Sequence, residues 1–133
     1  MSDEELVQAF ESGALENFPH ESHVRVAWCY LRRDPILVAL ARFRASLQRF
    51  AAGKGKADRY HETMTIALLL LIADRRGDAG ESWEEFAARN PDLLQWPCPT
   101  LTELYAAGVL DSARAREVFV LPDVGETCDS GTI

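Results

Sequence analysis

The sequence predicts an all-α protein, a single-domain helical bundle of about four main helices followed by short C-terminal helices. Apolar residues recur at helical spacing in four long segments, whereas no convincing segment alternates apolar and polar residues between turn signals. The 133 residues suit one domain, and 47% hydrophobic with 26% charged residues is typical of a folded globular chain. We therefore expect a helical domain over residues 1–121 and a flexible acidic tail over 122–133.

Local start and stop signals define the four main helices. Asn17 and Pro19 supply a cap and a first-turn proline for the second helix, and Asp34-Pro35 repeats that start signal for the third. The fourth is apolar on every side between Met64 and Ile72, so we expect it at the centre of the bundle. The expected helices span about 3–14, 19–33, 36–52 and 60–75.

Shorter helices are expected in the C-terminal half of the chain. The residues from Ser82 to Glu85 form a capping box that opens one of them, and Asn90-Pro91 ends it. Thr100 and Ser112 are cap candidates for two later helices. The segment 118–121 is the only weak strand candidate. The later helices are expected over about 91–96, 100–107 and 112–119.

Composition narrows the range of partners and locations. A net charge of −7 disfavours nucleic acid as a general partner. The N-terminus lacks a basic region followed by an apolar one, and the longest apolar run, 66–73, is far below the roughly 20 residues of a membrane span. The three cysteines, Cys29, Cys98 and Cys128, form no C-x-x-C pair. We expect a cytoplasmic protein without a membrane partner.

The basic residues are concentrated in one part of the chain. Nine of the fourteen lie in 25–59, which carries a net charge of +7 against −14 for the remainder. A solvated helix face balanced by the acidic ends of the chain explains this pattern most simply. The alternative is a face that docks an acidic partner or a small anionic ligand. A homodimer through exposed parts of Trp83, Trp96 or Tyr105 is compatible with either reading.

All three histidines fall at the N-terminal ends of two expected helices. His20 and His23 are neighbours on one face, and His61 lies above an apolar stripe of the fourth helix. Both stripes should face the core, so we expect the three rings to converge at one end of the bundle. Three neutral imidazoles can hold a divalent Zn, Fe, Cu or Ni ion and leave a coordination position open.

Other side chains near these histidines could take part in chemistry. Glu62 is a candidate base or a hydrogen-bond acceptor behind a metal ligand, Tyr60 adds a hydroxyl, and Arg25 could bind an anionic substrate. These three residues are the catalytic candidates, and His20, His23 and His61 are the metal candidates. Two alternatives stay open, namely a metal-free acid–base pocket and purely structural histidines.

Three blocks of sequence are similar to those of a known family. They are H-x-x-H-x-R-x-A-W over 20–28, Y-H-E-T over 60–63, and A-R-x-x-F-V-x-P-D over 115–123. In this order they resemble a family of small, uncharacterised helical bacterial proteins, and the likeness covers most of residues 10–123. The resemblance supplies no activity, but it implies a shared site. The residues that it assigns to the family's motifs are His20, His23, Arg25, Tyr60, His61, Glu62 and Thr63.

The leading hypothesis is a small helical enzyme or ligand-binding protein with a pocket formed by His20, His23 and His61. A divalent transition metal is a candidate cofactor for that pocket. The alternative is a protein-interaction module that uses the basic 25–59 face, with structural histidines.

Overall fold

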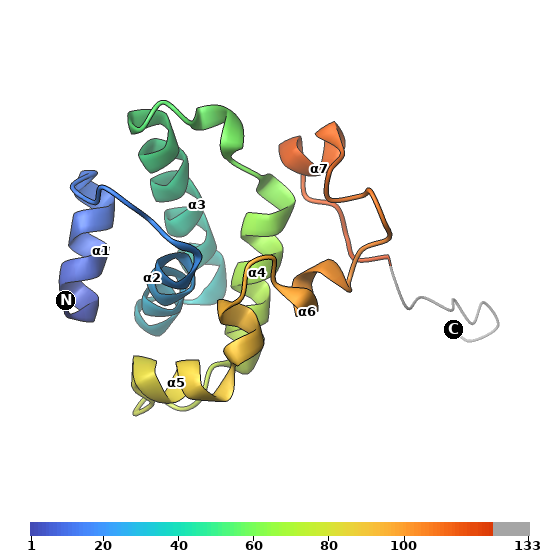
Figure 1. Ribbon diagram of the computed structural model, residues 1–133. Helices are drawn as coiled ribbons and strands as arrows, with labels where there is room; N and C mark the ends of the chain where they lie inside the picture. Colours follow the sequence, from blue (N-terminus) through green and yellow to red (C-terminus); the bar gives the residue numbers. More distant parts are fainter. Residues whose placement is uncertain (124–133) are drawn as a thin grey trace.

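The computed structural model describes residues 1–123 and confirms the all-α fold class: these residues form helices, turns and loops, without a strand. The long helices come first along the chain, and the short ones follow (Figure 1). The helices are α1 (Asp3–Ser12), α2 (His20–Arg33), α3 (Ile36–Gly53), α4 (Glu62–Arg75), α5 (Trp83–Arg89), α6 (Pro99–Thr102) and α7 (Ala113–Glu117), and two 3-10 turns are η1 (Ala57–Arg59) and η2 (Pro91–Leu94).

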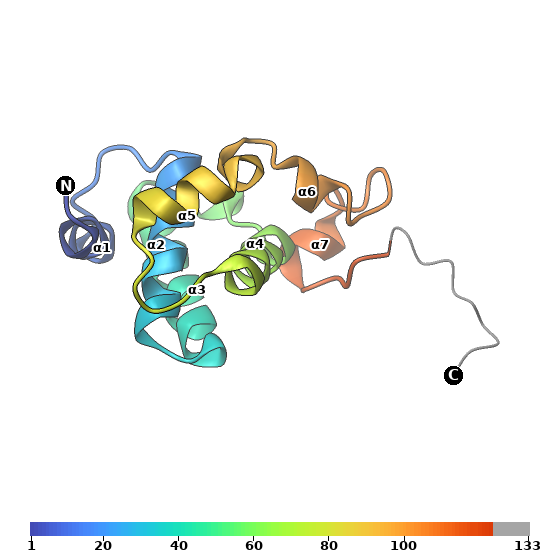
Figure 2. The same cartoon turned by 90° about the horizontal axis from the view of Figure 1, so that it is seen from below.

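Helix α2 lies at the middle of the packing. It contacts α1, α3, α4 and η2, and the end-on view in Figure 2 shows it between α1 and α4. All residues from Val26 to Leu31 are buried. Helix α4, predicted as the central helix, contacts α2, α3, α6 and α7 and buries Leu69 and Ile72, but it is not enclosed on every side because Leu70 is 39% exposed. An apolar sequence all round a helix does not fix which side its neighbours cover.

Two of the predicted N-caps are confirmed, whereas Asn17, Asp34 and Thr100 do not cap α2, α3 and α6. Pro19 is the N-cap of α2 rather than a first-turn residue, so His20 opens the helix. His61 is the N-cap of α4, which begins two residues later than expected. Helix α6 begins at Pro99 and stops at Thr102, because the following amides bond three residues back and tighten the backbone into turns. The side chains of Ser82 and Ser112 cap α5 and α7 as predicted.

The described residues after α7 are held on the domain by hydrogen bonds of the Thr63 side chain and by one backbone hydrogen bond. The Thr63 hydroxyl donates to the Val118 carbonyl at 2.8 Å and accepts from the Val120 amide at 3.1 Å. The Asp123 amide donates to the Leu104 carbonyl at 3.0 Å. The weak strand candidate at 118–121 is therefore an extended segment without a strand partner in the described part of the chain. Of the predicted acidic tail, only Pro122 and Asp123 are described, and the rest lies outside the described residues.

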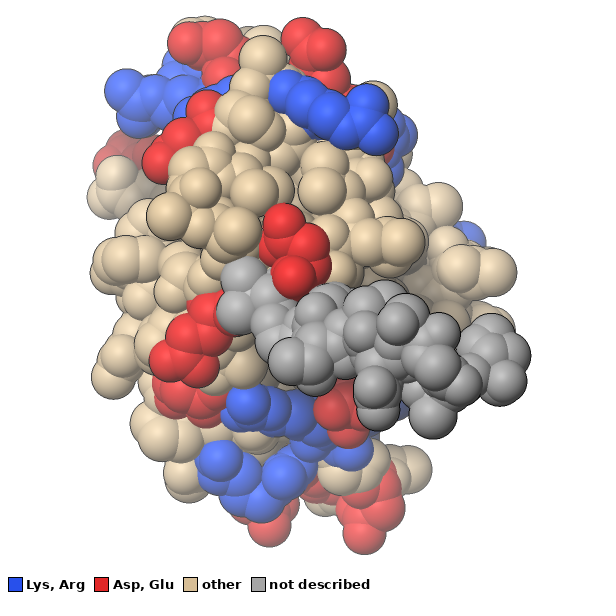
Figure 3. Space-filling model, turned by 90° about the vertical axis from the view of Figure 1, so that its right-hand side faces the viewer, with Lys and Arg blue, Asp and Glu red and all other residues tan. Residues whose placement is uncertain are grey.

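Charged side chains are unevenly spread over the face that includes α7. Figure 3 shows most Lys, Arg, Asp and Glu side chains of that face near its top and bottom, with a largely uncharged band between them. Within residues 1–123, no helix has the length and apolar character needed to cross a membrane.

Candidate functional site

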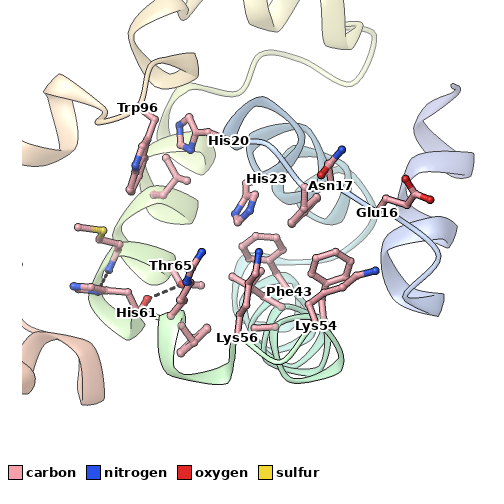
Figure 4. A pocket seen from close by; sticks show the side chains of 18 residues that line it. Glu16, Asn17, His20, His23, Phe43, Lys54, Lys56, His61, Thr65 and Trp96 are labelled. Carbon is pink, nitrogen blue, oxygen red and sulfur yellow. Dashed lines mark hydrogen bonds between the residues drawn. The ribbon is translucent and has the colours of Figure 1, made fainter.

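A cavity of about 540 Å³ lies where the first turn of α2, the end of α3 and the start of α4 meet. All three histidines line it, as do Tyr60 and Thr65, so the structure brings together most of the predicted pocket around one space. Figure 4 shows His20 and His23 along one side with Trp96, and His61 with Thr65 on the α4 side. The apolar lining consists mainly of Phe18, Phe43, Leu47, Phe50, Met64, Leu68 and Trp96.

His20 keeps one ring nitrogen free. Its Nε2 lies 2.8 Å from the carbonyl oxygen of Leu93, which can only accept, so Nε2 carries the hydrogen. The neutral ring then has an unprotonated Nδ1. The ring lies against Trp96, with 4.9 Å between centroids. Burial lowers the pKa of His20, against the hydrogen bond to Leu93, which raises it.

His23 is a neutral imidazole packed on an aromatic ring. Its centroid lies 4.0 Å from that of Phe18, with the two rings stacked. Burial, and next the charge of His20, lower the pKa of His23 to about 4, against a hydrogen bond to the Phe18 backbone. A neutral imidazole has one nitrogen that carries a hydrogen and one that accepts, and the His23 ring lines the cavity.

His61 has no free nitrogen. Its Nδ1 accepts the Met64 amide at 3.1 Å, which caps α4, and its Nε2 donates to the Leu110 carbonyl at 2.6 Å. The residue is 8% exposed. His61 therefore joins the start of α4 to the segment before α7, and it cannot bind a metal without breaking one of these bonds.

The arrangement differs from the three-imidazole metal site predicted from the sequence. Residues 1–123 contain no group of three or more His, Cys, Asp or Glu side chains placed to hold a metal ion. The rings of His20 and His23 are 6.4 Å apart between centroids, and His61 is committed to backbone groups. Metal binding stays a prediction that this geometry does not favour.

Glu62 and Tyr60 form a hydrogen-bonded group with Arg44 beside the cavity. The Tyr60 hydroxyl donates to Glu62 Oε1 at 2.6 Å, and Arg44 Nε contacts both carboxylate oxygens at 2.8 and 3.0 Å. Burial raises the pKa of Glu62, but the bonds from Arg44 and Tyr60 outweigh it and hold the pKa below its usual value. A carboxylate paired in this way is a weak base. Glu62 therefore orients Tyr60, which itself lines the cavity.

Arg25 lies outside the cavity lining. Its Nε donates to Asp3 Oδ1 at 2.8 Å, and a terminal nitrogen donates to the Met1 carbonyl at 3.0 Å. These bonds attach the start of α1 to α2. Arg25 therefore has a docking role in this structure instead of the anion-binding role predicted for it.

Sequence reasoning missed the groups that determine the chemical character of the cavity. Phe43 and Phe50 were not among the predicted site residues, and neither was the segment 53–56. In the structure Lys54, Lys56 and Arg59 line the cavity, with Glu16 as its one acidic residue. The end of the Phe43–Phe50 stripe, directly before two lysines, was the signal available in the sequence.

The depressed pKa of His23 predicts that acid destabilises the fold. An unfolded histidine takes up a proton near pH 6.5, whereas folded His23 resists protonation until about pH 4. Stability is therefore full above pH 6.5 and is lost as pH falls towards 4, by about 3 kcal/mol for this shift. Urea unfolding between pH 4 and 7.5 measures this slope, which the His23→Leu variant should flatten. An equal slope in both proteins would contradict the assignment.

The fold and the cavity define a single-domain all-α protein with a histidine-lined cavity. A comparison of the chain with known protein families, with curated proteins and with solved structures finds no match. Membership of the bacterial family with the three sequence blocks stays a prediction. Two of the blocks are in contact in the structure, because Thr63 of the second block forms hydrogen bonds with Val118 and Val120 of the third.

Proposed function

We propose that the protein binds a small organic molecule in the cavity between α2, α3 and α4, with His20 and His23 as hydrogen-bond acceptors. The observation that carries this proposal is the pair of imidazoles, His20 and His23, on the wall of a largely apolar cavity. Ligand sites commonly combine an apolar lining with a few placed polar groups. The pocket of about 540 Å³ has the size of a small-molecule site.

The chemistry of the two imidazoles favours a ligand with an N–H or O–H group. Neutral His20 donates its one hydrogen to Leu93 and so has an accepting nitrogen left, and the neutral ring of His23 also has one accepting nitrogen. An apolar ligand that carries a donor would satisfy an acceptor and bury its rings against Phe18 and Trp96. The same nitrogens could accept a proton from a bound substrate, so an enzymatic role rests on the same two residues.

The test compares two probes that differ in one hydrogen-bond donor, 2-naphthol and 2-methoxynaphthalene, by isothermal titration calorimetry at pH 7. We expect 2-naphthol to bind more tightly, because only its hydroxyl can donate to an imidazole. The His23→Leu variant should weaken 2-naphthol binding about tenfold, since a buried hydroxyl is left unpaired. Binding of 2-methoxynaphthalene should change little. Arg33→Gln, at an exposed position outside the cavity, is the control variant.

Two results would contradict this proposal. One is the same affinity for both probes in the wild type and in the His23→Leu variant, with helix content retained by circular dichroism. The other is binding that disappears after chelation and returns with added zinc, iron, copper or nickel. That result would favour the second candidate, a metal-dependent function in which His20 and His23 supply ligands through their free nitrogens.

A further inference from the structure

We propose that the ligand is an aromatic organic acid that enters donor-end first, with its anionic group held by Lys54, Lys56 and Arg59 at the mouth of the cavity. This inference rests on the binding function proposed above and specifies its ligand class. It follows from the two kinds of polar group that line the cavity. His20 and His23 offer neutral acceptors, and Lys54, Lys56 and Arg59 offer cations.

The three cations lie close together in the sequence, and the described residues place few acidic side chains beside them. Lys54, Lys56 and Arg59 line the cavity together with a single acidic residue, Glu16, in a protein whose net charge is −7. Within residues 1–123 these three cations form no ion pair, whereas Arg25, Arg42 and Arg44 of the same basic segment each pair with an acidic residue. The basic face predicted from the sequence is therefore free of internal partners at the cavity.

The backbone after α3 holds these cations at the cavity. The amide of Lys54 bonds to the carbonyl of Phe50 at 3.1 Å, and the amide of Lys56 bonds to that of Ala51 at 2.8 Å. The Arg59 amide then bonds to the Lys56 carbonyl at 2.9 Å, which continues the fold into η1. Gly55 makes this turn with φ 71°, a conformation that other residues rarely adopt. The bases of the three side chains are thus fixed by local hydrogen bonds.

Aromatic rings of the lining connect His23 to Lys54. Phe18 stacks on His23 and lies 5.2 Å from Phe50 between centroids, and the Lys54 ammonium lies 5.4 Å from the Phe50 ring centroid. A continuous series of rings therefore runs from an imidazole acceptor to a cation. A flat apolar body with a donor at one end and an anion at the other matches this order of groups.

Few carboxylates of residues 1–123 could compete with an anionic ligand for these three cations. Glu62 is occupied by Arg44 and Tyr60, and within residues 1–123 the exposed Glu16 is the acidic residue of the lining. The field at the mouth thus favours an anion over a neutral or cationic group. Because these charges are exposed, salt should weaken their attraction strongly.

The test uses 6-hydroxy-2-naphthoate, its uncharged amide 6-hydroxy-2-naphthamide, and 2-naphthoate, which lacks the hydroxyl. At low salt and pH 7 we expect the hydroxy acid to bind about tenfold more tightly than either of the other two, measured by calorimetry. Its advantage over the amide should fall to about twofold in 0.5 M NaCl. The Lys54→Gln/Lys56→Gln double variant should remove most of that advantage because it weakens binding of the acid far more than binding of the amide, whereas Arg33→Gln should change neither affinity.

The outcomes separate this inference from the function on which it rests. Equal affinity for the hydroxy acid and its amide, with both lost in His23→Leu, would overturn the organic-acid inference and support the cavity as a binding site. An advantage that persists in the double variant would overturn the assignment of the anion to the lysines. No binding of any probe would overturn both proposals.

Discussion

Replacing His61 by alanine is expected to lower the free energy of unfolding by about 2–4 kcal/mol. The change removes the side-chain cap from the Met64 amide, and loss of a cap costs about 0.5–2 kcal/mol. It also leaves the Leu110 carbonyl without the ring nitrogen at 2.6 Å, and an unpaired buried group costs about 1–3 kcal/mol. Urea unfolding monitored by circular dichroism measures the difference.

Two further variants make the His61 experiment specific. His61→Asn can still accept the Met64 amide, so it should recover about 1 kcal/mol of the loss. His20→Ala removes one hydrogen bond of a half-buried ring and should cost only about 1 kcal/mol. If His61→Ala proved as stable as the wild type but lost metal or ligand binding, the structural role assigned to His61 would be wrong.

Replacing Phe10 by alanine is expected to destabilise the protein by about 3–5 kcal/mol. Phe10 is 1% exposed and stacks on Phe18 with centroids 4.5 Å apart, and its ring lies 5.5 Å from that of Phe50. Truncation would leave a void behind two rings that line the cavity. The variant should therefore also weaken binding of 2-naphthol, provided that binding is measured below its lowered melting temperature.

Two control variants test whether the loss of stability comes from the buried packing of Phe10. Phe10→Leu retains most of the buried apolar volume and should lose clearly less stability than Phe10→Ala. Val118→Ala, at a 42% exposed side chain, should change stability by less than about 0.5 kcal/mol. A Phe10→Ala protein within 1 kcal/mol of the wild type would contradict the packing role assigned to Phe10.

The long helices could be predicted from the sequence because their signals are local. Asp34 and Pro35 separate α2 from α3, and Gly13 ends α1 in a left-handed conformation. In both places the helix ends because of the backbone conformation of one or two residues. The short helices were harder to predict. Helix α6 stops at Thr102, and the backbone after it forms turns. The Tyr105 hydroxyl that follows these turns donates to the Val120 carbonyl, 15 residues away, and no local sequence signal indicates such a contact.

The sequence by itself determined that three histidines lie at the starts of two helices and above apolar stripes, since helical spacing fixes which side chains share a face. It did not determine which imidazole nitrogens are free. That depends on the carbonyls of Leu93 and Leu110, which lie 73 and 49 residues from the histidines that they bind. Tertiary packing thus commits both nitrogens of His61 and one nitrogen of His20 to backbone groups, because hydrogen-bond partners distant in sequence follow no local periodicity.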